Sequence, residues 1–123
     1  MEQKKFKVLI AEDEKIIALD IQKILSKAGF DVLSIVSNGE DVVLHSRTYK
    51  PDLVLMDIGL RGKMNGIDAG ELIKKELNIP TIYLSGSTKY AMLEDIRIKM
   101  NSNFLSKPFN EKALLDAIRR IIS

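Results

Sequence analysis

The chain has 123 residues, of which 46% are hydrophobic and 29% charged, and its formal net charge is +2. This length and balance are typical of one globular domain, and they exclude a disordered chain or two domains of ordinary size. The basic residues are scattered, which argues against nucleic acid as the primary ligand. No segment approaches the roughly 20 apolar residues of a membrane span, and the polar start is unlike a signal peptide. Cysteine is absent, which excludes disulfides and thiolate metal sites and suits a cytoplasmic location.

The start of the chain predicts two strand and helix pairs. Residues 6–11 form an apolar run of strand length, and helical spacing follows as far as Gly29. A second strand is predicted at 32–36, and Asn38 suits the cap of a short second helix through 44–45. The first helix is expected to bury a face of four residues: Ile17, Ile21, Ile24 and Ala28.

The rest of the chain continues this alternation. Pro51 closes the connection to a third strand, 53–56, which is apolar until Asp57, and a loop at 59–66 leads to a third helix. The remaining predicted elements are a fourth strand at 81–84, a fourth helix over about 88–100, a fifth strand at 103–105 and a last helix from about Asn110. Apolar residues at helical spacing mark two of these helices: Ile67, Leu72, Ile73 and Leu77 in the third, and Leu114, Leu115, Ile118 and Ile121 in the last.

Strands that are apolar on both faces and alternate with helices predict a parallel sheet with helices on both sides. The fold class is therefore a doubly wound α/β sandwich. In such open sheets, ligands bind beyond the carboxyl ends of the strands. Four of the five predicted strands deliver polar side chains to that edge: residues 12–14, Asp57, residues 85–87 and Lys107.

Each of these groups alone has an ordinary structural interpretation. Residues 12–14 would favour a helix start, Asp57 would cap a turn, and Ser85 and Lys107 would be loop or surface side chains. Together, however, the carboxylates would repel one another and would need a cation. Because the chain has no Cys and one His, oxygen ligands favour Mg²⁺, with Mn²⁺ as a substitute, over zinc.

The same edge offers the groups that phosphoryl transfer requires, namely a nucleophile, cations and hydrogen-bond donors. Asp57 is the only carboxylate at the end of the central predicted strand. A carboxylate can accept a phosphoryl group as an acyl phosphate when a metal ion offsets the charge repulsion. We therefore expect Asp57 to be the nucleophile.

Four segments resemble the signatures of response-regulator receiver domains, in the order of that family: residues 8–14, 52–57, 81–86 and 104–109. The resemblance covers essentially the whole chain. Residues 1–123 are therefore expected to form a single receiver domain, either complete or as the N-terminal part of a larger regulator. The resemblance also implies a (βα)5, flavodoxin-like sheet of strand order 2-1-3-4-5.

The resemblance implies a role for each polar residue at the edge. Asp13 and Asp57 would bind Mg²⁺ directly with the backbone carbonyl of Gly59, and Glu12 would hold a metal-bound water. Lys107 would contact the phosphoryl oxygens.

Three further features follow from the resemblance. Ser85 would bond the phosphoryl group through its hydroxyl, and Phe104 would swing inward in response, although Phe104 also suits a plain core aromatic. The bond between Lys107 and Pro108 would be cis, against a base rate of about 5–6% for bonds before proline.

By the same resemblance, the phosphodonor is a phosphohistidine on a sensor histidine kinase or a phosphotransfer protein. Slow hydrolysis would reset the chain, which would act as a switch and not as a turnover enzyme. The face of the fourth helix, fifth strand and last helix would change its contacts with an output domain or protein. The family also uses this face for homodimers. No direct contact with nucleic acid or membrane is expected, and Arg97, Lys99, Arg119 and Arg120 are interpreted as a solvated surface.

Three alternatives fit the sequence less well. A phosphatase of the haloacid dehalogenase kind needs a second Asp at position 59, where this chain has Gly59. A flavodoxin-like cofactor binder needs Ser, Thr and Gly after the first strand, where residues 12–14 would repel a phosphate. A degenerate receiver that acts only as an interaction module is disfavoured by the intact site. The lone His45 is interpreted as a surface residue without a role.

The loop after Asp57 departs from the family. It lacks the usual proline and is one residue longer, which leaves its geometry open. Gly59 and Ser87 are small, so we expect water to reach the acyl phosphate with little obstruction.

Overall fold

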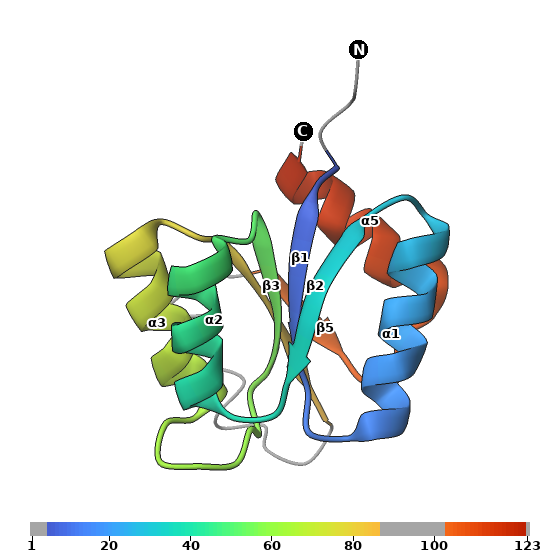
Figure 1. Cartoon of the computed structure of the whole chain (residues 1–123). Coiled ribbons are helices and arrows are strands. Elements are labelled where there is room, and N and C mark those ends of the chain that lie inside the picture. The colour runs from blue at the N-terminus through green and yellow to red at the C-terminus, as the bar shows by residue number, and fades with distance from the viewer. Residues whose placement is uncertain (1–4, 87–102, 123) are drawn as a thin grey trace.

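The computed structural model describes residues 5–86 and 103–122, and these residues form a five-stranded parallel sheet between two layers of helices (Figure 1). The strand order is β2-β1-β3-β4-β5, which confirms the predicted order and the doubly wound class. The predicted fourth helix lies outside the described residues, as do Ser87, Arg97 and Lys99. The strands are β1 (Lys7–Ala11), β2 (Asp31–Val36), β3 (Leu53–Asp57), β4 (Thr81–Ser85) and β5 (Asn103–Ser106).

Among the described residues, two helices lie on each side of the sheet (Figure 1): α1 (Lys15–Lys27) and α5 (Glu111–Ile122) on one face, α2 (Gly39–Tyr49) and α3 (Gly66–Leu77) on the other. Successive residues of the strands alternate between two apolar clusters. Val8 and Ile10 pack with α1 and α5, whereas Leu9 and Ala11 pack with α2 and α3. Because both faces are covered, the central strand β3 is buried throughout, and this burial holds its last residue, Asp57, in a fixed place.

Asparagine side chains begin three of the helices. Asn38 accepts a 2.8 Å hydrogen bond from the backbone N–H of Asp41, which confirms the predicted cap of α2. Asn65 does the same for α3 at 2.9 Å, and Asn110 for α5 at 2.7 Å. Each amide oxygen satisfies a backbone donor that the helix leaves without a partner.

Two predictions about the helices were wrong in detail. The second helix continues to Tyr49, well past His45, because its last turn is polar and carries no apolar signal. In α1, the fully buried residues are Ala18, Ile21 and Leu25, whereas Ala28 lies past the helix end and is exposed. The predicted Ile21 is among these buried residues, and the predicted Ile17 and Ile24 pack half-buried against the same cluster, so only Ala28 was wrongly assigned to the buried face.

The sequence suggested that His45 is a surface residue, but the structure places it partly inside the protein. Its side chain is half-buried, its Nδ1 atom lies 2.9 Å from Ser34 Oγ, and its ring meets Tyr49 edge to face. The ring therefore ties α2 to the edge strand β2. Within the described ranges, no helix has the length and apolar character needed to cross a membrane.

Candidate functional site

The register of the parallel strands brings four chain segments to one edge of the sheet. Glu12 directly follows β1, and its backbone N–H donates to the carbonyl of Val36 at 2.9 Å. Asp57 is the last residue of β3. Lys107 follows β5, and its backbone N–H donates to Ser85 at the end of β4 at 2.7 Å. The prediction that these polar residues meet at the carboxyl ends of the strands is confirmed.

Three carboxylates form a compact group at this edge. One oxygen each of Glu12, Asp13 and Asp57 lies within 4.8 Å of the others. Glu12 is 2% exposed and Asp57 is 7% exposed. Buried negative charges this close repel one another, and an oxygen-only donor set of this kind suits a hard divalent cation such as Mg²⁺. Glu14, which the sequence placed in the same acidic run, is exposed at the start of α1.

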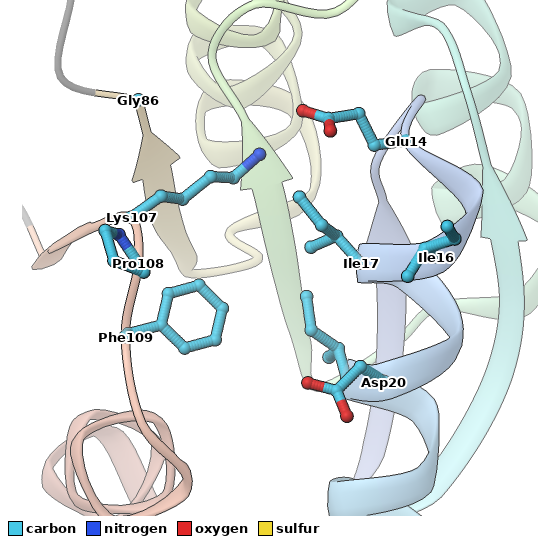
Figure 2. Close-up of a pocket in the computed structure, with 9 residues that line it drawn as sticks. Glu14, Ile16, Ile17, Asp20, Gly86, Lys107, Pro108 and Phe109 are labelled. Carbon is cyan, nitrogen blue, oxygen red and sulfur yellow. The ribbon is translucent and has the colours of Figure 1, made fainter.

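Lys107 supplies a positive charge to the carboxylates. Its Nζ atom donates to Glu12 Oε2 at 2.6 Å and lies 3.6 Å from Asp57 Oδ2. In Figure 2, the side chain extends from its own segment toward the end of β3. The following bond to Pro108 is cis, as predicted.

Burial and charge shift two pKa values in this group. Burial raises the pKa of the Glu12 carboxyl to about 7, and the negative charge of Asp57 adds to the rise, although hydrogen bonds from Lys107 and Glu14 oppose it. Burial acts to lower the pKa of Lys107, but the hydrogen bond to Glu12 and the charges of Asp57, Glu12 and Glu14 outweigh it and raise the pKa. Lys107 is therefore a fixed cation, whereas Glu12 exchanges its proton near neutral pH.

The other predicted site residues lie in the loop after β3 and on the strands β4 and β5. Gly59 donates its backbone N–H to Asp57 Oδ1 at 3.0 Å, which orients the carboxylate. Ser85 is 2% exposed, and its hydroxyl donates to the carbonyl of Gly86 at 2.9 Å. Phe104 lies opposite Tyr83 in the ladder between β4 and β5 and packs half-buried against the cluster beneath α2 and α3.

Sequence reasoning missed one charged residue at the site. Arg61 lies in the loop between β3 and α3, and its Nε atom is 3.4 Å from Asp13 Oδ2. The sequence carries no signal for this contact, because a cation four residues past the end of a strand can point in any direction until the loop conformation is known.

A cavity of about 550 Å³ adjoins the site between α1 and the segment after β5 (Figure 2). Ile16, Ile17 and Asp20 line it from the helix, and Lys107, Pro108 and Phe109 line it from the opposite side. Ile16, one of the lining residues, is 84% exposed. The cavity and the carboxylate site share Lys107.

The sheet order, the buried carboxylates and the lysine define a doubly wound α/β protein. Its charged site lies at the carboxyl ends of the strands. The profile of the response regulator receiver domain family matches residues 8–119. The chain belongs to this family, and the resemblance seen in its motifs is confirmed.

Individual relatives agree with this assignment. The chain is 32% identical over 117 residues to the transcriptional regulatory protein PdtaR of Mycobacterium tuberculosis, covering 95% of this chain but only 57% of that protein. It is 32% identical over 116 residues to the chemotaxis protein CheY of Thermotoga maritima, covering 94% and 96% of the two chains. The signal receiver domain of a modulated diguanylate cyclase from Desulfovibrio desulfuricans G20 superposes with a TM-score of 0.88 at 28% identity, over 97% of this chain and 94% of that one.

Proposed function

We propose that this receiver domain accepts a phosphoryl group onto Asp57 from a phosphohistidine of a sensor histidine kinase or phosphotransfer protein, in the cytoplasm and with Mg²⁺ required. The observation that carries the proposal is the position of Asp57. Its carboxylate ends the buried central strand, Gly59 N–H orients one oxygen, and Lys107 Nζ lies 3.6 Å from the other. A nucleophile, a donor and a cation therefore meet at one point, as phosphoryl transfer requires.

The acidic group fits a magnesium ion. Asp13, Asp57 and the backbone carbonyl of Gly59 would hold it directly, and Glu12 would hold one of its waters. When bound, the ion neutralises negative charge on the carboxylates and on the phosphoryl oxygens. Mn²⁺ has similar ligand preferences and would substitute.

In the transfer, a carboxylate oxygen of Asp57 forms a bond to phosphorus while the bond between phosphorus and the donor histidine nitrogen breaks, and that nitrogen keeps the electron pair. Lys107 stabilises the charge on the phosphoryl oxygens, since its ammonium already faces the carboxylate. Water later attacks the phosphorus atom, the bond from phosphorus to the Asp57 oxygen breaks, and inorganic phosphate leaves the restored carboxylate. The chain thus acts as a switch with slow self-dephosphorylation and not as a turnover enzyme.

The phosphoryl group would bias a two-state arrangement. The Ser85 hydroxyl, which donates to Gly86 in the unphosphorylated chain, would turn to a phosphoryl oxygen. Phe104 is half-buried and would move further inward in response. The face predicted from the sequence, of which the described residues include β5 and α5, would then bind an output domain or protein, or a second copy of the chain.

The cavity beside α1 is the proposed contact for the phosphodonor protein. A donor must bring its phosphohistidine in line with Asp57, so its surface has to rest on the elements that border the site. Lys107 lines the cavity and also contacts the carboxylates, and the exposed Ile16 offers an apolar contact on α1 (Figure 2). A small phosphodonor would need no such contact.

The test is intact mass after incubation with Mg²⁺ and acetyl phosphate. The native chain should gain one phosphoryl group, and Asp57→Asn should gain none, nor should the native chain without the metal. Asp52→Asn is the matched control, because Asp52 is an exposed carboxylate just before the other end of the same strand. No mass gain in a folded native chain would favour an interaction module instead.

A further inference from the structure

The loop between β3 and α3 is fastened to the beginning of α2. Arg61 pairs with Asn38 in an isolated parallel bridge, and the backbone N–H of Met64 donates to Glu40 Oε1 at 2.7 Å. Two points of attachment, one on each side of Gly62, define the path of this loop. The sequence could not predict the conformation of this loop, and these two contacts define it.

Gly62 is the residue that lets Glu40 reach beneath the loop. Its φ is +104°, a conformation that residues with side chains rarely adopt. A Cβ atom at this position would lie 2.7 Å from Glu40 Oε2, closer than such atoms approach in proteins. The positive φ, together with the close approach of the Glu40 carboxylate, favours glycine at this position.

The fastened loop places Arg61 over the acidic group. Its Nε atom lies 3.4 Å from Asp13 Oδ2, while 87% of its side chain is exposed to solvent. Glu12, Asp13 and Asp57 carry up to three negative charges, and Lys107 and Arg61 bring two positive charges to them. Of these two cations, Lys107 is buried among the carboxylates, whereas Arg61 is exposed and can leave.

We infer that Arg61 is a tethered counter-ion that competes with Mg²⁺ for Asp13 and so lowers the metal affinity of the site, and that Glu40 is the residue that positions it. The inference rests on the proposed function, in which Asp13 is a magnesium ligand. Binding of the metal must break or weaken the contact between Arg61 and Asp13, and the two cations then repel each other across a short distance.

The expected size of the effect follows from the exposure of the pair. Exposed ion pairs are weak and are screened by salt, so loss of Arg61 should tighten Mg²⁺ binding by only about three- to tenfold at low ionic strength. The difference should shrink toward nothing as salt is raised to about 1 M, where the screening length is about 3 Å.

The experiment is a calorimetric titration of the unphosphorylated chain with Mg²⁺, on the native protein and on Arg61→Gln. The matched control is Lys63→Gln, which removes the same charge from the same exposed loop. Tighter binding in Arg61→Gln, with Lys63→Gln within about twofold of native, supports the inference. Equal gains in both variants would mean that only net charge matters, and would overturn it.

Substitutions of Glu40 separate tethering from charge. Glu40→Ala removes a negative charge near the site, which by charge alone should weaken Mg²⁺ binding. If Glu40 holds the loop, the same variant should instead tighten binding, because Arg61 is released. Glu40→Gln loses the charge but keeps an oxygen for Met64 N–H, so it should not tighten binding. Weaker binding in both Glu40 variants would overturn its positioning role.

The outcomes also separate this inference from the proposed function. If Asp13→Asn abolishes Mg²⁺ binding while Arg61→Gln binds as the native chain does, the metal site stands and the counter-ion role is wrong. If the folded native chain binds no Mg²⁺ at millimolar concentration, both the proposed metal site and the inference fail. Combining Arg61→Gln with Glu40→Ala should give no gain beyond that of Arg61→Gln alone, since both act through one contact.

Discussion

Lys107 and Glu12 are 95 positions apart in the chain, yet a hydrogen bond of 2.6 Å joins Nζ of the lysine to Oε2 of the glutamate. Their side chains are 13% and 0% exposed. Removing one partner of such a pair leaves the other charge buried without compensation. Loss of the lysine alone is therefore expected to destabilise the fold.

The first prediction is that Lys107→Met lowers the free energy of unfolding by about 2–4 kcal/mol at pH 8, measured by urea denaturation without metal. The loss should be smaller at pH 6, because Glu12 then takes up a proton and no longer needs the cation. Lys112→Met is the control, since it breaks an ion pair with Asp116 that is exposed on α5. An equal loss in both variants would contradict a special role of the buried pair.

The second prediction concerns pH and Glu12 in the metal-free chain. The pKa of this carboxyl is about 7 in the folded chain, against 4.5 as its ordinary value. Between these two values the folded state binds more protons than the unfolded state, so stability falls as pH rises from about 4.5 to about 7. The contribution is on the order of 3 kcal/mol and is lost by pH 8.

Glu12→Gln removes the titrating group, so its stability should change less over this range than that of the native chain. Urea denaturation at pH 5, 6, 7 and 8 gives the comparison. Added Mg²⁺ should stabilise the native chain more at pH 8 than at pH 5, because the metal and the proton compete for the acidic group. Parallel pH profiles for the two proteins would show that Glu12 does not titrate in this range.

The third prediction tests the cavity beside α1. Ile16→Ser should slow phosphoryl transfer from a histidine kinase or phosphotransfer protein by about tenfold, because an apolar anchor at an interface contributes on the order of 1–2 kcal/mol. Transfer from acetyl phosphate should not change. Leu44→Ser is the matched control, because Leu44 is another exposed apolar residue, 57% exposed, on the opposite face of the sheet. Similar slowing in the two variants would argue against the cavity as the contact.

The fourth prediction is that the phosphorylated form is short-lived and that Gly59 is one reason. A Cβ atom at this position would lie 3.6 Å from Asp57 Oδ1, an ordinary contact distance. Gly59→Met should therefore fold normally, cover the acyl phosphate and lengthen its lifetime several-fold. Time-resolved intact mass after removal of the phosphodonor measures this, and a native lifetime of many hours would refute the idea of open access.

The fifth prediction concerns packing beneath α3. Within the described part of the chain, the buried hydroxyl of Tyr83 has no hydrogen-bond partner, and burial raises the pKa of this side chain. Tyr83→Phe should thus raise the free energy of unfolding by up to about 1 kcal/mol. A Cβ atom at Gly70 would collide with the same hydroxyl, so Gly70→Ala should destabilise the chain, and should cost less in the Tyr83→Phe background.

The sequence by itself determined the doubly wound fold class and the set of residues at the edge, whereas the strand order was expected only from the resemblance to the receiver family. Parallel strands have a strong local signal, since continuous apolar runs alternate with helical periods, and their carboxyl ends must meet at one edge. Asp57 and Lys107 could be assigned to the site for that reason. The asparagine cap of α2 was also visible, because Asn38 needs only its own neighbours to act.

Only the tertiary structure decided the contacts that depend on loops and on packing. The last turn of α2 is polar, so its helical conformation has no periodic signal in the sequence. The half-burial of His45 depends on its contact with the neighbouring strand β2. The approach of Arg61 to Asp13 depends on Glu40, which is distant in the chain from both. A loop without hydrophobic period takes its path from such hydrogen bonds, and no local pattern of residues encodes which acceptor will be within reach.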